Sequence, residues 1–120
     1  MVRGIRGAAQ ASANTKEAIY EASSSLIKAI LDRNDLDQEQ IISIFVTSTT
    51  DLNADFPAYA IRSYGLDRVP VLGATEVTVP GAMPRLIRFL VHVDVDKPRD
   101  AIKHVYLGPT ATLRPDLASE

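Results

Sequence analysis

The chain contains no cysteine and no tryptophan, and only two of its 120 residues are histidines. Without cysteine it can form no disulfide, use no thiolate nucleophile and offer no thiolate to a metal. His92 and His104 fall on different predicted elements with no third ligand beside them, so we expect no metal site. No transmembrane run or signal peptide is recognisable, so we expect a cytoplasmic protein that does not bind membranes.

Positive charge is also scarce, because 13 Lys and Arg residues face 15 Asp and Glu residues. A net charge of -2 argues against a general nucleic-acid binder, which needs a dense cationic surface. Nine of the 13 cations are arginine, the side chain best suited to bidentate binding of a small anion. A compositional bias explains that count equally well. The length and the hydrophobic content of 46% predict a single domain over residues 1–120.

The clearest local pattern is an amphipathic helix over residues 15–33, where apolar residues recur at helical spacing. Asn14 and Glu17 have the spacing of a capping box, which predicts Asn14 as the N-cap. Asn34 is expected to take the left-handed position that ends the helix. The serine run 23–25 reads as a solvated helix segment, in preference to a phosphorylation site.

Two apolar, β-branched runs, residues 41–47 and 86–95, predict the main strands. In the second run the odd-numbered residues are all apolar, as expected for a strand with one buried face. Shorter strands are predicted at 2–7, 69–72 and 105–107, loops at 8–14 and 78–84, and two short helical turns at 57–64 closed by Gly65. The order predicts an α+β or α/β fold with one mixed sheet packed on one long helix. Because that helix covers only one face, we expect a partner subunit on the other.

Arg88 is the most informative candidate, because it lies in an apolar strand between Ile87 and Phe89. A buried guanidinium is unfavourable unless an anion pairs with it, which suggests a bound anionic substrate. An internal salt bridge, or an arginine that faces solvent, explains the position of Arg88 as well. Glu76 stands alone among neutral residues. It is interpreted as a hydrogen-bond acceptor for the substrate or a general base, or else as a surface residue or the partner of an arginine. No serine elbow or phosphate loop is present. The residues therefore suit a reaction that needs binding and electrostatics, without a nucleophile or a metal.

Six short motifs, in order and with matching spacing over essentially the whole chain, resemble the monofunctional, Bacillus-like AroH-type chorismate mutases. They are Val2-Arg3-Gly4-Ile5-Arg6-Gly7, Asp51-Leu52 followed by Phe56-Pro57-Ala58, Val69-Pro70-Val71 with Glu76 after it, Ile87-Arg88, His104-Val105-Tyr106-Leu107, and Leu113-Arg114-Pro115-Asp116-Leu117. The resemblance implies the rearrangement of chorismate to prephenate in aromatic amino acid biosynthesis, with no cofactor. It also implies a homotrimeric pseudo-α/β-barrel with active sites between subunits.

The resemblance also implies roles for individual residues. Arg88 is expected to supply the cation at the breaking ether oxygen, and Arg6 and Tyr106 to hold a carboxylate. Glu76 is expected to accept the substrate hydroxyl, which makes Arg88, Arg6 and Glu76 the catalytic set. The other implied substrate-binding positions are Phe56, Ala58, Arg62, Leu72, Gly73, Ala74, Thr75, Leu113 and Arg114.

Two positions depart from the family pattern. Relatives often carry Cys or Ser where this chain has Gly73, and some carry Lys where it has Tyr59. A side-chain contact is lost at the first position unless the amide of Gly73 or Ala74 replaces it, and a cation is lost at the second. Two alternative functions remain at this stage, a non-catalytic trimeric binder of small carboxylates and an imine-hydrolysing trimer of similar architecture.

Overall fold

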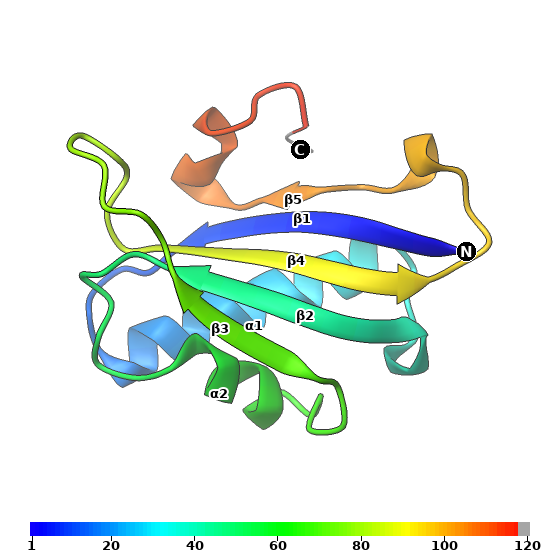
Figure 1. The fold of residues 1–120 in the computed structure, drawn as a ribbon, viewed down its shortest axis with the longest axis horizontal. Coiled ribbons are helices and arrows are strands. Elements are labelled where there is room, and N and C mark those ends of the chain that lie inside the picture. The colour runs from blue at the N-terminus through cyan, green and yellow to red at the C-terminus, as the bar shows by residue number, and fades with distance from the viewer. Residues whose placement is uncertain (118–120) are drawn as a thin grey trace.

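A five-stranded mixed sheet organises the chain, of which a computed structural model describes residues 1–117 (Figure 1). Its strands are β1 (Val2–Gln10), β2 (Ile41–Ser48), β3 (Val71–Thr75), β4 (Leu86–Asp94) and β5 (Val105–Tyr106). They lie in the order β3-β2-β4-β1-β5. The central strand β4 runs antiparallel to β1 and β2, whereas β3 is parallel to β2 and β5 is parallel to β1. The predicted mixed sheet is confirmed.

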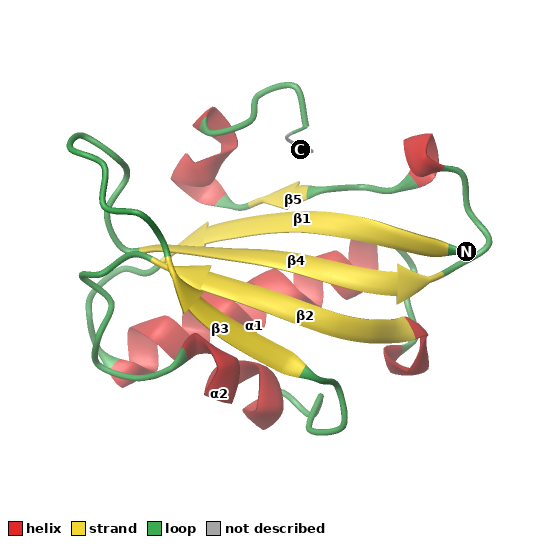
Figure 2. Ribbon diagram, viewed as in Figure 1, coloured by secondary structure: helices red, strands yellow, loops and turns green. Residues whose placement is uncertain are grey.

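Two helices, α1 (Lys16–Arg33) and α2 (Pro57–Ser63), pack on one face of the sheet (Figures 1 and 2). Short 3-10 turns occupy Gln38–Gln40, Arg99–Ala101 and Gly108–Thr112. The two predicted turns at 57–64 are one continuous helix that begins at Pro57, where a missing N–H carries no penalty. Gly65 closes it at φ 116°, a left-handed conformation that glycine adopts readily.

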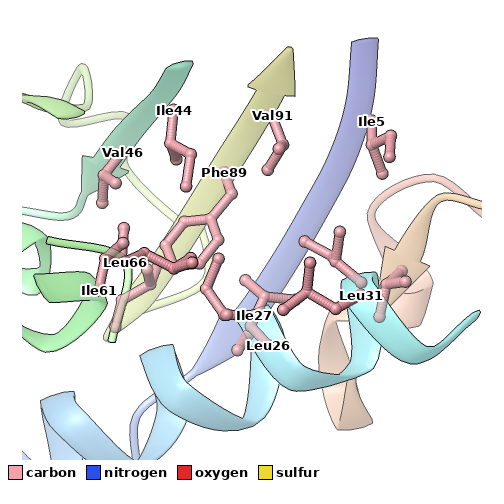
Figure 3. Packing of buried hydrophobic residues seen from close by; sticks show 14 of the residues in the cluster. Ile5, Leu26, Ile27, Leu31, Ile44, Val46, Ile61, Leu66, Phe89 and Val91 are labelled. Carbon is pink, nitrogen blue, oxygen red and sulfur yellow. The ribbon is translucent and has the colours of Figure 1, made fainter. Parts of the chain in front are cut away.

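The core lies between this face of the sheet and the helices (Figure 3). Phe89 and Val91 of β4 point toward Ile27 of α1, and both are at most 3% exposed. Ile61 and Leu66 extend the same core beneath β2. The odd-numbered face of β4 is therefore buried as the alternation predicts, and its even-numbered residues face the other side of the sheet.

The predictions at the start of α1 are wrong by a few residues. The loop expected from residue 8 begins only after Gln10, because residues 8–10 continue the ladder with β4. Thr15, and not Asn14, is the N-cap: its hydroxyl oxygen accepts the backbone N–H of Ala18 at 3.1 Å. A side-chain cap of this kind is worth about 1 kcal/mol, and Thr15 leaves Asn14 available for other contacts.

The end of α1 also differs from expectation. Asp35, and not Asn34, adopts the left-handed conformation, with φ 51°. Asn34 is buried and bridges two segments, because its amide donates to the carbonyls of Ile30 and Lys103 and accepts the N–H of Lys103. Ser23 is fully buried within α1, so the prediction that the serine run 23–25 faces solvent is wrong at Ser23.

The face of the sheet opposite the helices, here called the open face, carries exposed apolar side chains. Phe45 is 46% exposed, Leu90 is 38% exposed and Leu72 is 62% exposed. Part of this face is covered where Met83, Leu113 and Leu117 pack against the cluster of Ala8, Leu86 and Tyr106. No helix within residues 1–117 combines the length and the apolar character that crossing a membrane requires.

Candidate active site

Arg88 and Tyr106, distant in the sequence, lie in one row across the open face. In the register of the sheet Arg88 pairs with Thr47 on one side and with Ala8 on the other, and Ala8 pairs with Tyr106. Arg6 lies two residues before Ala8 on the same face of β1. The fold therefore brings Arg6, Arg88 and Tyr106 to one surface, around a hollow of about 350 Å³ that they line together with Phe45 and Thr47.

Glu76 joins this surface through an ion pair with Arg88. Its Oε2 lies 3.1 Å from Arg88 Nε and accepts a hydrogen bond from Thr47 Oγ1 at 2.8 Å. The internal salt bridge that the sequence left open is thus present. Within residues 1–117 the two terminal nitrogens of Arg88 donate no hydrogen bond to the protein. We name Arg6, Glu76, Arg88 and Tyr106 the open-face group.

His104 ties the strand that carries Arg6 to the segment before β5. The backbone N–H of Arg6 donates to His104 Nδ1 at 2.9 Å, while the Arg6 guanidinium forms no ion pair within residues 1–117. Burial lowers the pKa of His104, and the positive charges of Arg6 and Arg114 lower this pKa further. A neutral ring is therefore favoured, and only a ring unprotonated at Nδ1 can accept this hydrogen bond.

A second hollow, of about 550 Å³, lies between the start of α2 and β3, on the side of the sheet that the helices cover. Its lining includes five of the predicted substrate-binding residues, which we name the edge group: Phe56, Ala58, Gly73, Ala74 and Thr75. A Cβ built on Gly73 would meet only the carbonyl oxygen of Val46, at 3.9 Å. A cysteine or serine would therefore fit at this position without rearrangement.

Tyr59 changes the surroundings of the edge group. The centroid of its ring lies 5.0 Å from that of the Phe56 ring. The guanidinium carbon of Arg62 lies 5.3 Å from the centroid of the Tyr59 ring. A cation over an aromatic ring is attracted to it. Tyr59 thus attracts the exposed guanidinium of Arg62, whereas a lysine at position 59 would repel it.

The two groups lie on opposite sides of the sheet. Arg88 stands on β4, two strands from β3, and faces away from the helices, whereas the hollow of the edge group opens on the helix side. Strands are about 4.8 Å apart, so roughly 10 Å of sheet separates them laterally as well. The hollow beside Arg88 and the hollow of the edge group share no lining residue.

Three other predicted residues lie nearer the open face. Leu72 pairs with Phe45 in the register and is exposed, and Leu113 packs on Tyr106. Arg114 pairs with Asp116 at 3.0 Å, and this carboxylate raises the pKa of Arg114 and keeps its charge engaged. No three His, Asp or Glu side chains gather as a metal-binding cluster in the described part of the chain.

Sequence reasoning missed Thr47 and Phe45, which line the hollow beside Arg88. Alternation along residues 41–47 places them on one face, and that signal was available. Their position next to Arg88 was not, because it depends on the register between β2 and β4.

Comparisons with known proteins agree with these motifs. A family model described as chorismate mutase type I matches residues 2–117. The chain is 46% identical over 120 residues to chorismate mutase AroH of Thermus thermophilus, which covers 99% of this chain and 98% of that protein. It is 39% identical over 119 residues to chorismate mutase AroH of Bacillus subtilis strain 168, covering 98% and 94%.

A solved structure shares the fold as well. Chorismate mutase from Clostridium thermocellum superimposes with a TM-score of 0.89 at 39% identity, over 92% of this chain and 98% of that one. Both the sequence and the architecture are thus similar to those of chorismate mutases.

Proposed function

The chain belongs to the chorismate mutase type I family and catalyses the rearrangement of chorismate to prephenate, and we propose that two neighbouring copies build each active site. The reaction is an intramolecular shift in which a ring-ether C–O bond breaks as a C–C bond forms. No group is transferred to the protein. The enzyme therefore works by holding the reactive conformer and by stabilising the charge that develops on the ether oxygen.

The separation of the two groups carries the proposal of a shared site. The hollow lined by Arg6, Arg88 and Tyr106 and the hollow lined by the edge group open on opposite sides of one sheet and share no lining residue. A site that uses both must take the open-face group from one copy and the edge group from its neighbour. Each copy then offers one group to each of two neighbours, an arrangement that closes into a ring.

The open-face group has the charges that chorismate requires. The free terminal nitrogens of Arg88 are directed to the ether oxygen, and its Nε is held by Glu76. Arg6 and Tyr106 hold a carboxylate, and Glu76 accepts the substrate hydroxyl. One well-placed donor in a water-poor site is worth about 3 kcal/mol in the transition state, which makes Arg88 the main source of rate acceleration.

The edge group of the neighbouring copy forms the opposite wall. Phe56 is 63% exposed within one chain, so a large apolar surface is available to pack against the substrate. Ala58 and residues 73–75 complete the wall, and Arg62 supplies a second anion contact at its rim. Leu72, Leu113 and Arg114 border the site, the last two as a cover from the C-terminal segment.

We propose a homotrimer as the assembled form. The apolar side chains on the open face, including Phe45, Leu72 and Leu90, support burial of this face against other copies. Three copies related by a threefold axis satisfy the ring that shared sites require. The cytoplasm and a single domain over residues 1–120 remain predictions from the sequence. The carboxylate-binding and imine-hydrolysing alternatives are not favoured, because the family match covers the chain.

Mixing two inactive variants tests the shared site. Arg88→Ala disables the open-face group, and Arg62→Glu places a negative charge at the edge group. The two proteins are refolded together in equal amounts. A site is intact when its open-face group comes from an Arg62→Glu copy and its edge group from an Arg88→Ala copy. Random mixing in a closed ring makes about one quarter of the sites intact, so about one quarter of the wild-type activity should return. Chorismate absorbance follows the reaction. No recovery on mixing would contradict a site shared between copies.

A further inference from the structure

The segment that leads into α2 is fastened to the start of α1 by one side chain. Asn14 Oδ1 accepts the backbone N–H groups of Asn53 and Ala54, both at 3.0 Å. Asn14 Nδ2 donates to Asn53 Oδ1 at 2.7 Å. All three hydrogen bonds join residues about 40 positions apart in the sequence, at the end of the sheet where β1 and β2 finish (Figure 1).

A second contact lies beside the first. Tyr20 of α1 donates its hydroxyl to Asp55 Oδ2 at 3.2 Å, and Asp55 Oδ1 accepts the backbone N–H of Phe56 at 2.7 Å. Burial and the nearby Asp55 raise the pKa of Tyr20, so this hydroxyl stays protonated and able to donate. The segment 53–56 is thus held at consecutive positions, by Asn14 just before α1 and by Tyr20 within it.

These contacts matter because Phe56 has little support of its own. Its side chain is 63% exposed and its ring contacts the Tyr59 ring at 5.0 Å, so within one chain the backbone determines where it points. Asn53, Ala54 and Asp55 also line the edge hollow themselves. A loop released at this point would have to be ordered again whenever the substrate binds, which weakens binding.

We infer that Asn14 is a positioning residue of the substrate site, which fixes the segment from Asn53 to Phe56 so that the wall of the edge group is formed before the substrate arrives. The inference rests on the proposed function, because it assumes that Phe56 contacts the substrate. Asn14 itself lies outside that wall and acts through the backbone of the loop. Its loss should therefore raise KM and change kcat little, since the charges of the open-face group remain in place.

Three variants separate the contacts. Asn14→Ala removes all three hydrogen bonds, and we expect a KM increase of about tenfold with kcat within about threefold of wild type. Asn14→Asp keeps an oxygen acceptor for both backbone N–H groups and should restore KM to within about threefold. Ser12→Ala is the matched control, because the nearby Ser12 is exposed and joins the segment 53–56 by no hydrogen bond within residues 1–117, so KM should stay nearly unchanged. Hydrogen exchange at the amides of Asn53 and Ala54 should accelerate in Asn14→Ala alone.

Several results would overturn the inference. One is a wild-type KM in Asn14→Ala despite faster exchange at the two amides, and another is an equal loss in Asn14→Asp and Asn14→Ala. Should Asn14→Ala not fold, Tyr20→Phe loosens the same segment through Asp55, and an unchanged KM in that variant would count against the inference. Phe56→Ala distinguishes failure of the proposed site from failure of the role of Asn14. A wild-type KM in Phe56→Ala would refute the substrate contact of Phe56. A raised KM in Phe56→Ala together with a wild-type KM in Asn14→Ala would refute only the role of Asn14.

Discussion

The ion pair between Glu76 and Arg88 shows how one arginine can serve two purposes. Arg88 Nε pairs with Glu76 Oε2, which also accepts a hydrogen bond from Thr47, and Arg88 lines the hollow on the open face. The Arg88 side chain is 45% exposed in the single chain, so the pair contributes little to stability and mainly fixes orientation. Removal of Arg88 should therefore affect catalysis far more than folding.

Arg88→Ala should lower kcat on the order of 10³-fold, because the charge acts on the transition state more than on the bound substrate. The melting temperature should stay close to that of wild type. Arg88→Lys keeps a charge but not the planar fork, and it should recover only part of the loss. Arg68→Ala, which removes an exposed arginine in the segment between α2 and β3, is the control and should keep full activity. Retention of one tenth of the wild-type kcat in Arg88→Ala would rule out the electrostatic role.

At the scale of elements, side chains at the strand and helix ends join segments that the sheet alone leaves separate. His104 links the approach to β5 with β1 through the N–H of Arg6, and Asn34 links the end of α1 to Lys103. Both lie just outside regular structure, where backbone groups lack ladder partners. The orientation of β5, and therefore of Tyr106, depends on these contacts.

The contact at His104 should make stability depend on pH. Burial lowers the pKa of His104 below its ordinary value of 6.5, so its stabilising contribution is complete above this value and is lost as the pH falls below it. We expect the free energy of unfolding, measured with urea at one protein concentration, to decrease between about pH 7.5 and 5.5. His104→Asn keeps an acceptor near the position of Nδ1 without titrating, and it should flatten this dependence. His92→Asn is the control and should keep the decrease, so a flat wild-type profile would contradict the argument.

At the scale of the whole molecule, the sheet has one covered and one uncovered face. The helices bury the odd-numbered side of β4, and the other side carries Phe45, Leu72 and Leu90 with large exposed areas. Exposed apolar side chains gathered on one face of a sheet indicate an interface. The same face holds the open-face group, so the proposed trimer would link assembly to completion of the active site.

Phe45→Glu should disrupt the proposed trimer, because it introduces a charge where apolar contact between copies is expected. Sedimentation velocity is the appropriate measurement, since Phe45 also lines the hollow at Arg88 and activity alone would be ambiguous. The expected result is a species of one third of the wild-type mass. Ser25→Glu, on the exposed side of α1, is the matched control and should keep the wild-type mass. A Phe45→Glu protein that sediments like wild type would contradict an interface on this face.

The sequence by itself determined the features that depend on neighbours along the chain. Alternation through residues 86–95 gave the buried face of β4, helical spacing gave α1, and Pro57 with Gly65 marked the ends of α2. The family motifs are equally local, and they sufficed to identify the chorismate mutase family. Each of these signals lies within a few residues, where periodicity and backbone preference act directly.

Only the tertiary structure decided which distant residues meet. Asn14 has the spacing of a cap, yet Thr15 takes that position and Asn14 binds a loop about 40 residues away. The pairing of Glu76 with Arg88 and Thr47, and the division of the predicted site over two sides of the sheet, follow from strand order and register. Register is set by packing between strands that are far apart in the chain, so no local pattern in the sequence contains it.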